Sequence, residues 1–337
     1  MNLSRRRFLG ASAAGAGLLL GRRLIAQSPA TVTPGRAQVA IFVDLEMARN
    51  FPRWEDQNWD YEKGNLDAGA KRWIVEAGRR VKAAGGVING FVVGQVLEQE
   101  NVDWLKEMTQ AGHPLGNHTY DHVSLSAAAP GTLQKRFERA PWLIEGKTVP
   151  EVLRENIRLC NAALKTRIGV VPKGFRTPDD FTIGLRDRPD LQKLLLDEGF
   201  EWVQCVYPAH PFGEAGKEPT PEVLDGIVKA IPTVQPFVYE SGLVEIPMSP
   251  PSDIIAFRHG KWTLETYLKS IRLGLDRAIA DGGVYVHLFH LGCIAAMDPE
   301  FRAVDLICRT VKEAGEKAAL VAGDEIARRA KASAGLR

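Results

Sequence analysis

The chain has 337 residues, of which 45% are apolar and 25% charged, and these proportions exclude intrinsic disorder, collagen and coiled coils. One large catalytic domain is compatible with this length. The formal net charge is +2, but residues 1–27 hold five arginines and no acid, so the remainder has 38 basic and 41 acidic residues, or −3. We therefore expect no nucleic-acid partner.

The first predicted element is a signal peptide over residues 1–27. Arg5 and Arg6 precede a weakly apolar stretch, residues 11–20, which at about ten residues is shorter than the roughly 20 needed to span a bilayer. The pattern resembles a bacterial twin-arginine export signal, with a basic disordered N-terminus or an uncleaved anchor as alternatives. The resemblance implies contact with the twin-arginine translocation machinery, a periplasmic or extracellular location, and no stable membrane span in the mature form.

A polar connector over residues 28–37 leads into short apolar runs that alternate with amphipathic stretches. This alternation predicts a parallel α/β sheet, most economically a barrel, in one catalytic domain over residues 38–325, followed by a polar tail over residues 326–337. The predicted strands lie at 39–44, 87–93, just before His118, and at 173–176, 202–206, 243–246 and 284–290. The predicted helices lie near 66–84, 100–111, 150–165, 190–198, 264–280 and 300–314.

Two segments depart from this alternation. Residues 47–63 hold Trp54 and Trp59 among charges, and residues 208–251 hold nine of the twenty prolines. Both are predicted to be long loops, and long loops over a rigid barrel often hold substrates. The alternative is that the aromatic side chains only cover the barrel rim.

The first predicted strand ends in two acids. Strand side chains alternate, so Asp44 and Glu46 point to one face while Leu45 points away. Two carboxylates on one face at a strand end require compensation by water, a cation or a proton. A solvated pair at the barrel rim is the alternative.

His118 and His122 are four residues apart, a spacing that can direct both imidazoles at one metal from a helix or from a tight turn after a strand. The flanking residues indicate a strand end that opens into a loop, which is where active sites of α/β barrels are built. Two surface or structural histidines are the alternative.

The last predicted strand contains two histidines with different expected roles. His290 lies on the aliphatic face that is expected to fill the barrel interior, whereas His287 lies on the opposite face. We therefore assign chemistry to His290 and a structural role to His287. Of the four cysteines, Cys160 and Cys308 lie on helical apolar stripes and are expected to be buried thiols, while pairing of Cys293 stays open.

Four motifs occur in an order that identifies a family resemblance. They are Asp44, His118-Thr119-x-x-His122, Arg176-Thr177-Pro178 and Leu288-Phe289-His290. The chain resembles the polysaccharide deacetylases, carbohydrate esterase family 4, over roughly residues 38–325. The resemblance implies a distorted or incomplete (β/α) barrel of about seven parallel strands and one divalent metal ion, with zinc expected.

The resemblance also implies roles for residues of the site. His118 and His122 are the implied metal ligands, and Asp44 is the implied catalytic base. The family usually has a second, adjacent Asp as third ligand, but Leu45 stands there, so Glu46 is our choice, with Asp44 as the alternative.

The remaining catalytic roles follow from the same resemblance. Arg176 is expected to hold the base carboxylate, and His290 to act as general acid. The family's usual acid near this histidine is missing from residues 202–206, so Asp253 is the expected substitute that orients His290.

The expected substrate contacts are Trp54, Trp59, Pro178 and Asp179. The family's usual small loop after the arginine motif carries two acids here, Asp179 and Asp180, which puts the common polymer groove in doubt.

Three functions are compatible with these features. The favoured one is an exported, metal-dependent hydrolase that removes acetyl groups from N- or O-acetylated polysaccharide. The second is a hydrolase of small, non-peptide cyclic amides on the same fold, with weak or no metal dependence. The third is a catalytically silent glycan-binding protein.

Overall fold

The computed structural model describes residues 35–46 and 63–336, which form one α/β unit. In this part of the chain nine strands make a curled sheet of order β6-β7-β5-β4-β3-β2-β1-β8, and β9 pairs with β1. Every pairing is parallel except that of β6 with β7. The strands are β1 (Ala37–Leu45), β2 (Ile88–Val92), β3 (Leu115–Asn117), β4 (Gly174–Phe181), β5 (Trp202–Val206), β6 (Phe237–Val238), β7 (Val244–Glu245), β8 (Val284–His290) and β9 (Ala318–Leu320).

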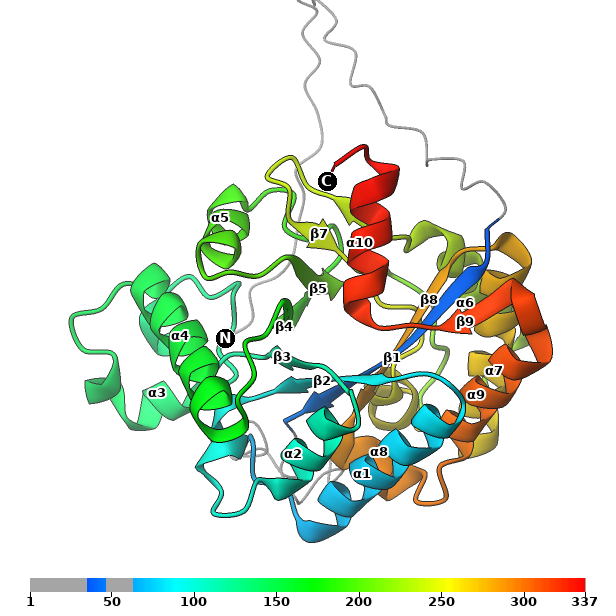
Figure 1. The fold of residues 1–337 in the computed structure, drawn as a ribbon, viewed down its shortest axis with the longest axis horizontal. Coiled ribbons are helices and arrows are strands. Elements are labelled where there is room, and N and C mark those ends of the chain that lie inside the picture. Colours follow the sequence, from blue (N-terminus) through cyan, green and yellow to red (C-terminus); the bar gives the residue numbers. More distant parts are fainter. Residues whose placement is uncertain (1–34, 47–62, 337) are drawn as a thin grey trace, which may run out of the picture. The chain divides into compact units, whose positions relative to one another are not determined.

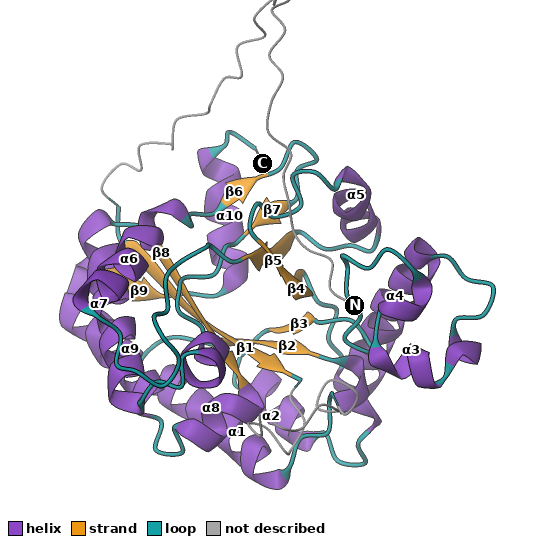
Figure 2. Ribbon diagram, turned by 180° about the vertical axis from the view of Figure 1, so that it is seen from behind, coloured by secondary structure: helices purple, strands orange, loops and turns teal. Residues whose placement is uncertain are grey.

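Helices surround the curled sheet on its outer side (Figures 1 and 2). None of the described helices has the length and apolarity that a bilayer crossing requires. The α-helices are α1 (Ala68–Ala83), α2 (Asp103–Gln110), α3 (Lys135–Arg139), α4 (Val149–Ile168), α5 (Pro189–Asp197), α6 (Pro221–Ala230), α7 (Leu264–Asp281), α8 (Leu291–Met297), α9 (Arg302–Ala314) and α10 (Gly323–Ser333). Short turns of 3₁₀ or π-helix are η1 (Gly94–Glu98), η2 (Pro130–Thr132), η3 (Pro141–Leu143), η4 (Ile231–Thr233), η5 (Ile254–His259) and η6 (Gly315–Lys317).

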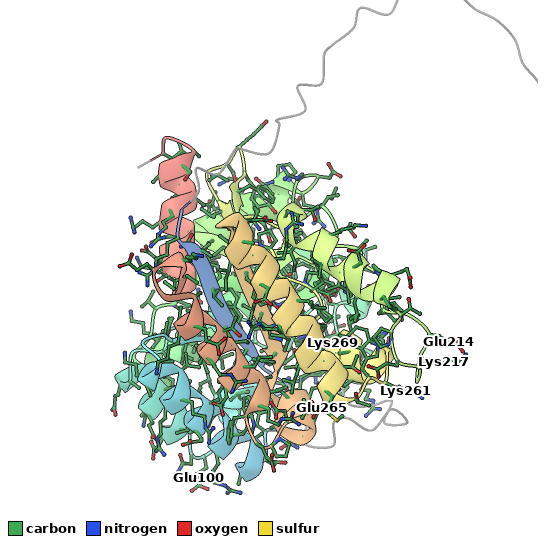
Figure 3. The ribbon with its side chains drawn as sticks, turned by 90° about the vertical axis from the view of Figure 1, so that its right-hand side faces the viewer. Glu100, Glu214, Lys217, Lys261, Glu265 and Lys269 are labelled. Carbon is green, nitrogen blue, oxygen red and sulfur yellow. The ribbon has the colours of Figure 1, made fainter. Side chains whose placement is uncertain are left out.

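Helix α7 shows how the sequence produces the outer layer. The Thr263 side chain caps its first turn, and Gly282 ends it in a left-handed conformation at φ 66°. Glu265 and Lys269, labelled in Figure 3, are exposed, whereas Tyr267 is buried against the sheet. The helix predicted for residues 264–280 is therefore confirmed.

The barrel closes irregularly between β5 and β8. Beyond β7, the backbone N–H groups of Ile246 and Met248 donate to Val203 and Val206 of β5, each at 2.9 Å. Ser249 then donates to the Val286 carbonyl of β8 at 2.9 Å, and its hydroxyl accepts from the Val286 N–H at 3.0 Å. The predicted distorted or incomplete α/β barrel is confirmed, with β1 to β5, β7 and β8 around its interior.

Three aromatic rings fill the barrel interior below the site. Phe42 lies 5.2 Å from Phe91 and 5.6 Å from Trp202 between ring centroids. On neighbouring strands, Gly116 pairs with Phe91 and Gly174 pairs with Trp202. A Cβ at Gly116 would lie 2.5 Å from the Phe91 ring, and one at Gly174 would collide with the Trp202 ring. Glycine at these two positions therefore leaves room for the three rings to pack together in the barrel interior. Asp44 is the next residue after Phe42 on the same face of β1, so it lies one layer above these rings.

Two predictions of organisation need correction. The segment 208–251 contains α6, η4, β6 and β7 and is not one long loop. Helix α6 was not predicted because the segment is rich in proline. Its Pro221 lies in the first turn of the helix, where proline is tolerated. The predicted domain end at residue 325 falls inside α10, whose Ile326 and Ala327 are buried in the core.

Candidate active site and metal centre

The carboxyl end of β1 places two acidic side chains in the barrel mouth. Asp44 is the strand's last inward-facing residue, and its Cα pairs in register with that of His290 on β8. Glu46 follows one residue after the end of β1. Both residues are almost fully buried, with 1% and 2% exposure. Buried carboxylates need cationic partners or hydrogen-bond donors, and the site supplies both.

The two histidines lie on a tight loop after β3, and not on a helix. Thr119 and His122 adopt left-handed φ values of 60° and 58°. The Asn117 side chain accepts from the Thr119 N–H at 2.7 Å and donates to the Ile157 carbonyl of α4 at 2.9 Å. The Thr119 hydroxyl accepts from the Val123 N–H at 3.0 Å. These hydrogen bonds hold a backbone conformation that non-glycine residues rarely adopt. The loop conformation in turn fixes the directions of the His118 and His122 side chains.

Glu46, His118 and His122 bring one ligand atom each to a common point. The His118 Nε2 lies 3.2 Å from Glu46 Oε2, and His122 Nε2 contacts the same oxygen. The two imidazole rings are 4.9 Å apart and nearly perpendicular, at 79°. The three donor atoms all lie within 4.8 Å of one another. Two imidazoles and a carboxylate are a common catalytic zinc donor set.

The surroundings of His118 also suit a metal ligand. Its Nδ1–H donates to the Arg176 carbonyl at 2.8 Å, which leaves the Nε2 lone pair facing Glu46. Burial lowers the pKa of His118, although the carboxylate of Asp44 acts in the opposite direction, so the ring is neutral at neutral pH. Burial would raise the pKa of Glu46, but His122 and Lys63 hold it well below its usual value.

Asp44 has one free oxygen and one shared oxygen. Its Oδ1 is buried and has no hydrogen-bond partner among the described residues. Its Oδ2 accepts from Arg176 Nε at 3.3 Å and lies 3.5 Å from His290 Nε2. Asp44 and His290 also form a second convergent group with Glu46. An orphaned buried carboxylate oxygen beside the Glu46 cluster fits a site that receives an ion or a water molecule.

Arg176 connects the site to the end of β4. Besides Asp44, its guanidinium binds Asp180 through Nη2 at 2.9 Å. Burial alone would lower the pKa of Arg176, but the Asp180 and Asp44 carboxylates raise it, so the side chain stays charged. Asp180 thus belongs to the Arg176 ion pair, a contact that its motif position did not reveal.

Asp253 reaches His290 from the segment that precedes η5. Its Oδ1 accepts from His290 Nδ1–H at 2.7 Å, and its Oδ2 accepts from the His290 backbone N–H, also at 2.7 Å. Burial would lower the pKa of His290, but Asp253, followed by Asp44, raises it to about 9. The ring is therefore protonated at neutral pH, and its Nε2 faces Asp44.

The structure adds a residue that sequence reasoning missed. Lys63 is buried, with its Nζ 2.7 Å from Glu46 Oε1 and 3.5 Å from His122 Nε2. No motif marks this lysine, which stands in a charged segment 17 positions after Glu46. Only its burial and pairing reveal it.

The four residues predicted to contact the substrate differ in what the structure shows of them. Trp54 and Trp59 lie outside the described residues. Pro178 is half-buried on β4, and Asp179 accepts from the Ser124 hydroxyl at 2.7 Å and from the Ser126 N–H at 3.0 Å, which ties β4 to the loop after His122.

His287 and the four cysteines lie in the protein interior. His287 is buried and contacts the Tyr267 hydroxyl at 2.7 Å and the Tyr285 hydroxyl at 3.1 Å, away from the site. All four cysteines are buried free thiols, which includes Cys293.

Comparisons with known proteins agree with this architecture. Residues 66–180 match the family model described as polysaccharide deacetylase. None of the curated proteins compared with the chain matches it. The fold is a distorted α/β barrel, and residues 66–180 are similar to polysaccharide deacetylases.

Three solved structures share this barrel. One from Mycobacterium smegmatis, described as a polysaccharide deacetylase, is 16% identical, with 90% of this chain and 93% of that chain covered and a TM-score of 0.59. One from Pseudomonas aeruginosa PAO1, with a similar description, is 13% identical, with 90% and 94% covered and a TM-score of 0.59. Puue allantoinase is 14% identical, with 89% and 91% covered and a TM-score of 0.59. At these identities the likeness concerns the fold.

Proposed function

We propose that the protein is an exported, metal-dependent hydrolase that removes acetyl groups from N- or O-acetylated polysaccharide. The observation that carries the proposal is the convergence of Glu46, His118 and His122 beside an unpaired Asp44 oxygen. The polysaccharide deacetylase match over residues 66–180 supports the reaction class.

The ion in this proposal is one zinc per chain, held by Glu46, His118 and His122. Imidazole suits zinc, and the three donors leave the side toward Asp44 and His290 for water and substrate. When bound, such an ion polarises a carbonyl group and lowers the pKa of water toward about 7.

Asp44 is the proposed general base. Its Oδ1 has no partner among the described residues and can accept a proton from the attacking water. Arg176 donates to Oδ2 and so holds the carboxylate in a fixed direction.

His290 is the proposed general acid. Its Nδ1 is bound to Asp253, so the proton on Nε2 points toward Asp44 and the reacting centre. An amide nitrogen leaves poorly unless it is protonated, and the Nε2 proton of His290 supplies that need. A contact of the glycan with Trp54, Trp59, Pro178 and Asp179 remains part of the proposal.

Acetate release tests the proposed function. We expect the purified protein to release acetate from at least one of chitooligosaccharides, peptidoglycan and acetylxylan, and an Asp44→Asn variant to release little. A folded, zinc-loaded protein that binds these glycans without releasing acetate would instead fit the catalytically silent alternative.

A second candidate is hydrolysis of small cyclic amides. Asp179 and Asp180 stand at the end of β4, where the family has a small loop, and Puue allantoinase shares the fold. Turnover of cyclic amides without acetate release from any of the three polymers would favour this candidate.

The pH dependence of activity should report on Asp253. The pKa of His290, raised to about 9, keeps the acid protonated below that pH, so kcat/KM should fall as the pH rises through this range. Asp253→Asn removes the charge that raises the pKa, so its alkaline limb should move to lower pH. A pH–rate profile of both proteins checks this, with His290→Ala as the reference that lacks the limb. An unchanged limb in Asp253→Asn would exclude His290 as its source.

Export should depend on Arg5 and Arg6. Because twin-arginine signals require both arginines, replacing both by lysine should retain the protein in the cytoplasm. Fractionation of the bacterial host followed by immunoblotting measures this. Equal periplasmic accumulation of the variant would reject the twin-arginine route, while Arg22→Lys with Arg23→Lys serves as the charge-matched control.

A further inference from the structure

Lys63 occupies a fixed place in the site. The N–H of the next residue, Gly64, donates to the Glu46 carbonyl at 2.6 Å, and the Gly64 carbonyl accepts from Gln99 Nε2 at 3.2 Å. These bonds attach the backbone beside Lys63 to the end of β1 and to the segment after η1. The fold therefore places the Lys63 side chain next to Glu46.

The Lys63 ammonium contacts two of the three proposed ligands. It lies 2.7 Å from Glu46 Oε1 and 3.5 Å from His122 Nε2, and its side chain is 2% exposed. The ammonium group holds the Glu46 carboxylate by Oε1, while the two imidazoles converge on Oε2, and it lies beside the His122 Nε2 that a metal ion would require.

Lys63 also places a positive charge directly beside the proposed metal ligand Glu46. Glu46 pairs with Lys63, Asp44 with Arg176, and Asp253 with His290. A divalent ion beside Glu46 would lie close to the Lys63 ammonium in a buried site, where repulsion between like charges is strong.

We propose that Lys63 is a positioning residue that competes with the metal ion for Glu46 and His122 and so limits the metal affinity of the site. This inference rests on the metal centre of the proposed function. The ammonium group leaves these two side chains when the ion binds. Loss of the charge at position 63 should therefore strengthen metal binding.

Zinc titration of the metal-stripped protein by calorimetry tests this directly. Lys63→Met should bind Zn²⁺ at least about tenfold more tightly than the wild type, because one buried repulsive charge is removed. Lys63→Arg retains the charge and should show no such gain. Lys269→Met removes the same charge from the exposed face of α7, outside the candidate site (Figure 3), and should match the wild type.

Addition of His118→Ala to Lys63→Met should abolish the tight binding and so locate it at this site. Since Lys63→Met leaves Glu46 without its cation and can weaken the fold, the zinc-induced rise in Tm provides a second readout. That rise should be larger in Lys63→Met than in the wild type.

The outcomes separate the two proposals. Equal zinc affinity in wild type and Lys63→Met overturns the role of Lys63 and leaves a metal-dependent hydrolase intact. Binding by Lys63→Met alone supports the role of Lys63 and contradicts metal dependence of the native protein. Absence of binding in both proteins overturns the metal centre together with the inference.

Discussion

Replacement of Asp44 by Asn should lower turnover by about 10²- to 10⁴-fold, the range for loss of a positioned base, and should leave metal binding largely intact. The amide is nearly isosteric with the carboxylate but cannot take the proton from water. We expect metal binding to survive because Glu46, His118 and His122 still converge in this variant. Acetate release and elemental analysis of the same sample measure both effects.

Glu46→Ala is the matched variant for this test. It removes the carboxylate that both imidazoles contact, so we expect loss of metal affinity. Loss of the ion in Asp44→Asn with retention in Glu46→Ala would show that the two carboxylates have exchanged roles. The convergence of Asp44 with Glu46 and His290 makes that reversal a concrete alternative.

His118→Ala is expected to lose the ion and nearly all activity while the barrel stays folded. The variant gives up one hydrogen bond to the Arg176 carbonyl and leaves a small cavity, a loss of about 1 to 3 kcal/mol against a stability of about 5 to 15 kcal/mol. Elemental analysis, circular dichroism and thermal denaturation measure the two effects separately.

His259→Ala is the control for that variant. His259 is exposed at the end of η5 and lies outside the candidate site, so its loss should leave the ion content unchanged. A folded His118→Ala protein that keeps its full complement of zinc would remove this histidine from the ligand set.

The convergence of the strand ends could be predicted because side-chain alternation is a local property. Alternation requires Asp44 and Glu46 to lie on the same face, and it makes His290 the last inward-facing residue of the final predicted strand. The parallel register then sets Asp44 opposite His290. The spacing of His118 and His122 likewise brought both rings to one point, although the sequence did not decide between a helix and a turn.

Other parts of the site depend on long-range packing that no local pattern encodes. Lys63 reaches Glu46 because of backbone bonds around Gly64, and Asp253 reaches His290 across 37 residues. The left-handed conformation at Thr119 has no sequence signal, because it is held by the side chain of Asn117 and by α4. Helix α6 was missed because its first residue, Pro221, lies among the other prolines of a segment that resembles a loop.

Removal and restoration of the ion test the central claim, that Glu46, His118 and His122 hold one ion on which hydrolysis depends. The measurement follows zinc content and acetate release together, in protein that has been stripped by a chelator, dialysed and then titrated with Zn²⁺. We expect acetate release to be lost on stripping, to rise in proportion to zinc, and to saturate at about one ion per chain. Full acetate release from protein that contains no metal would contradict the account.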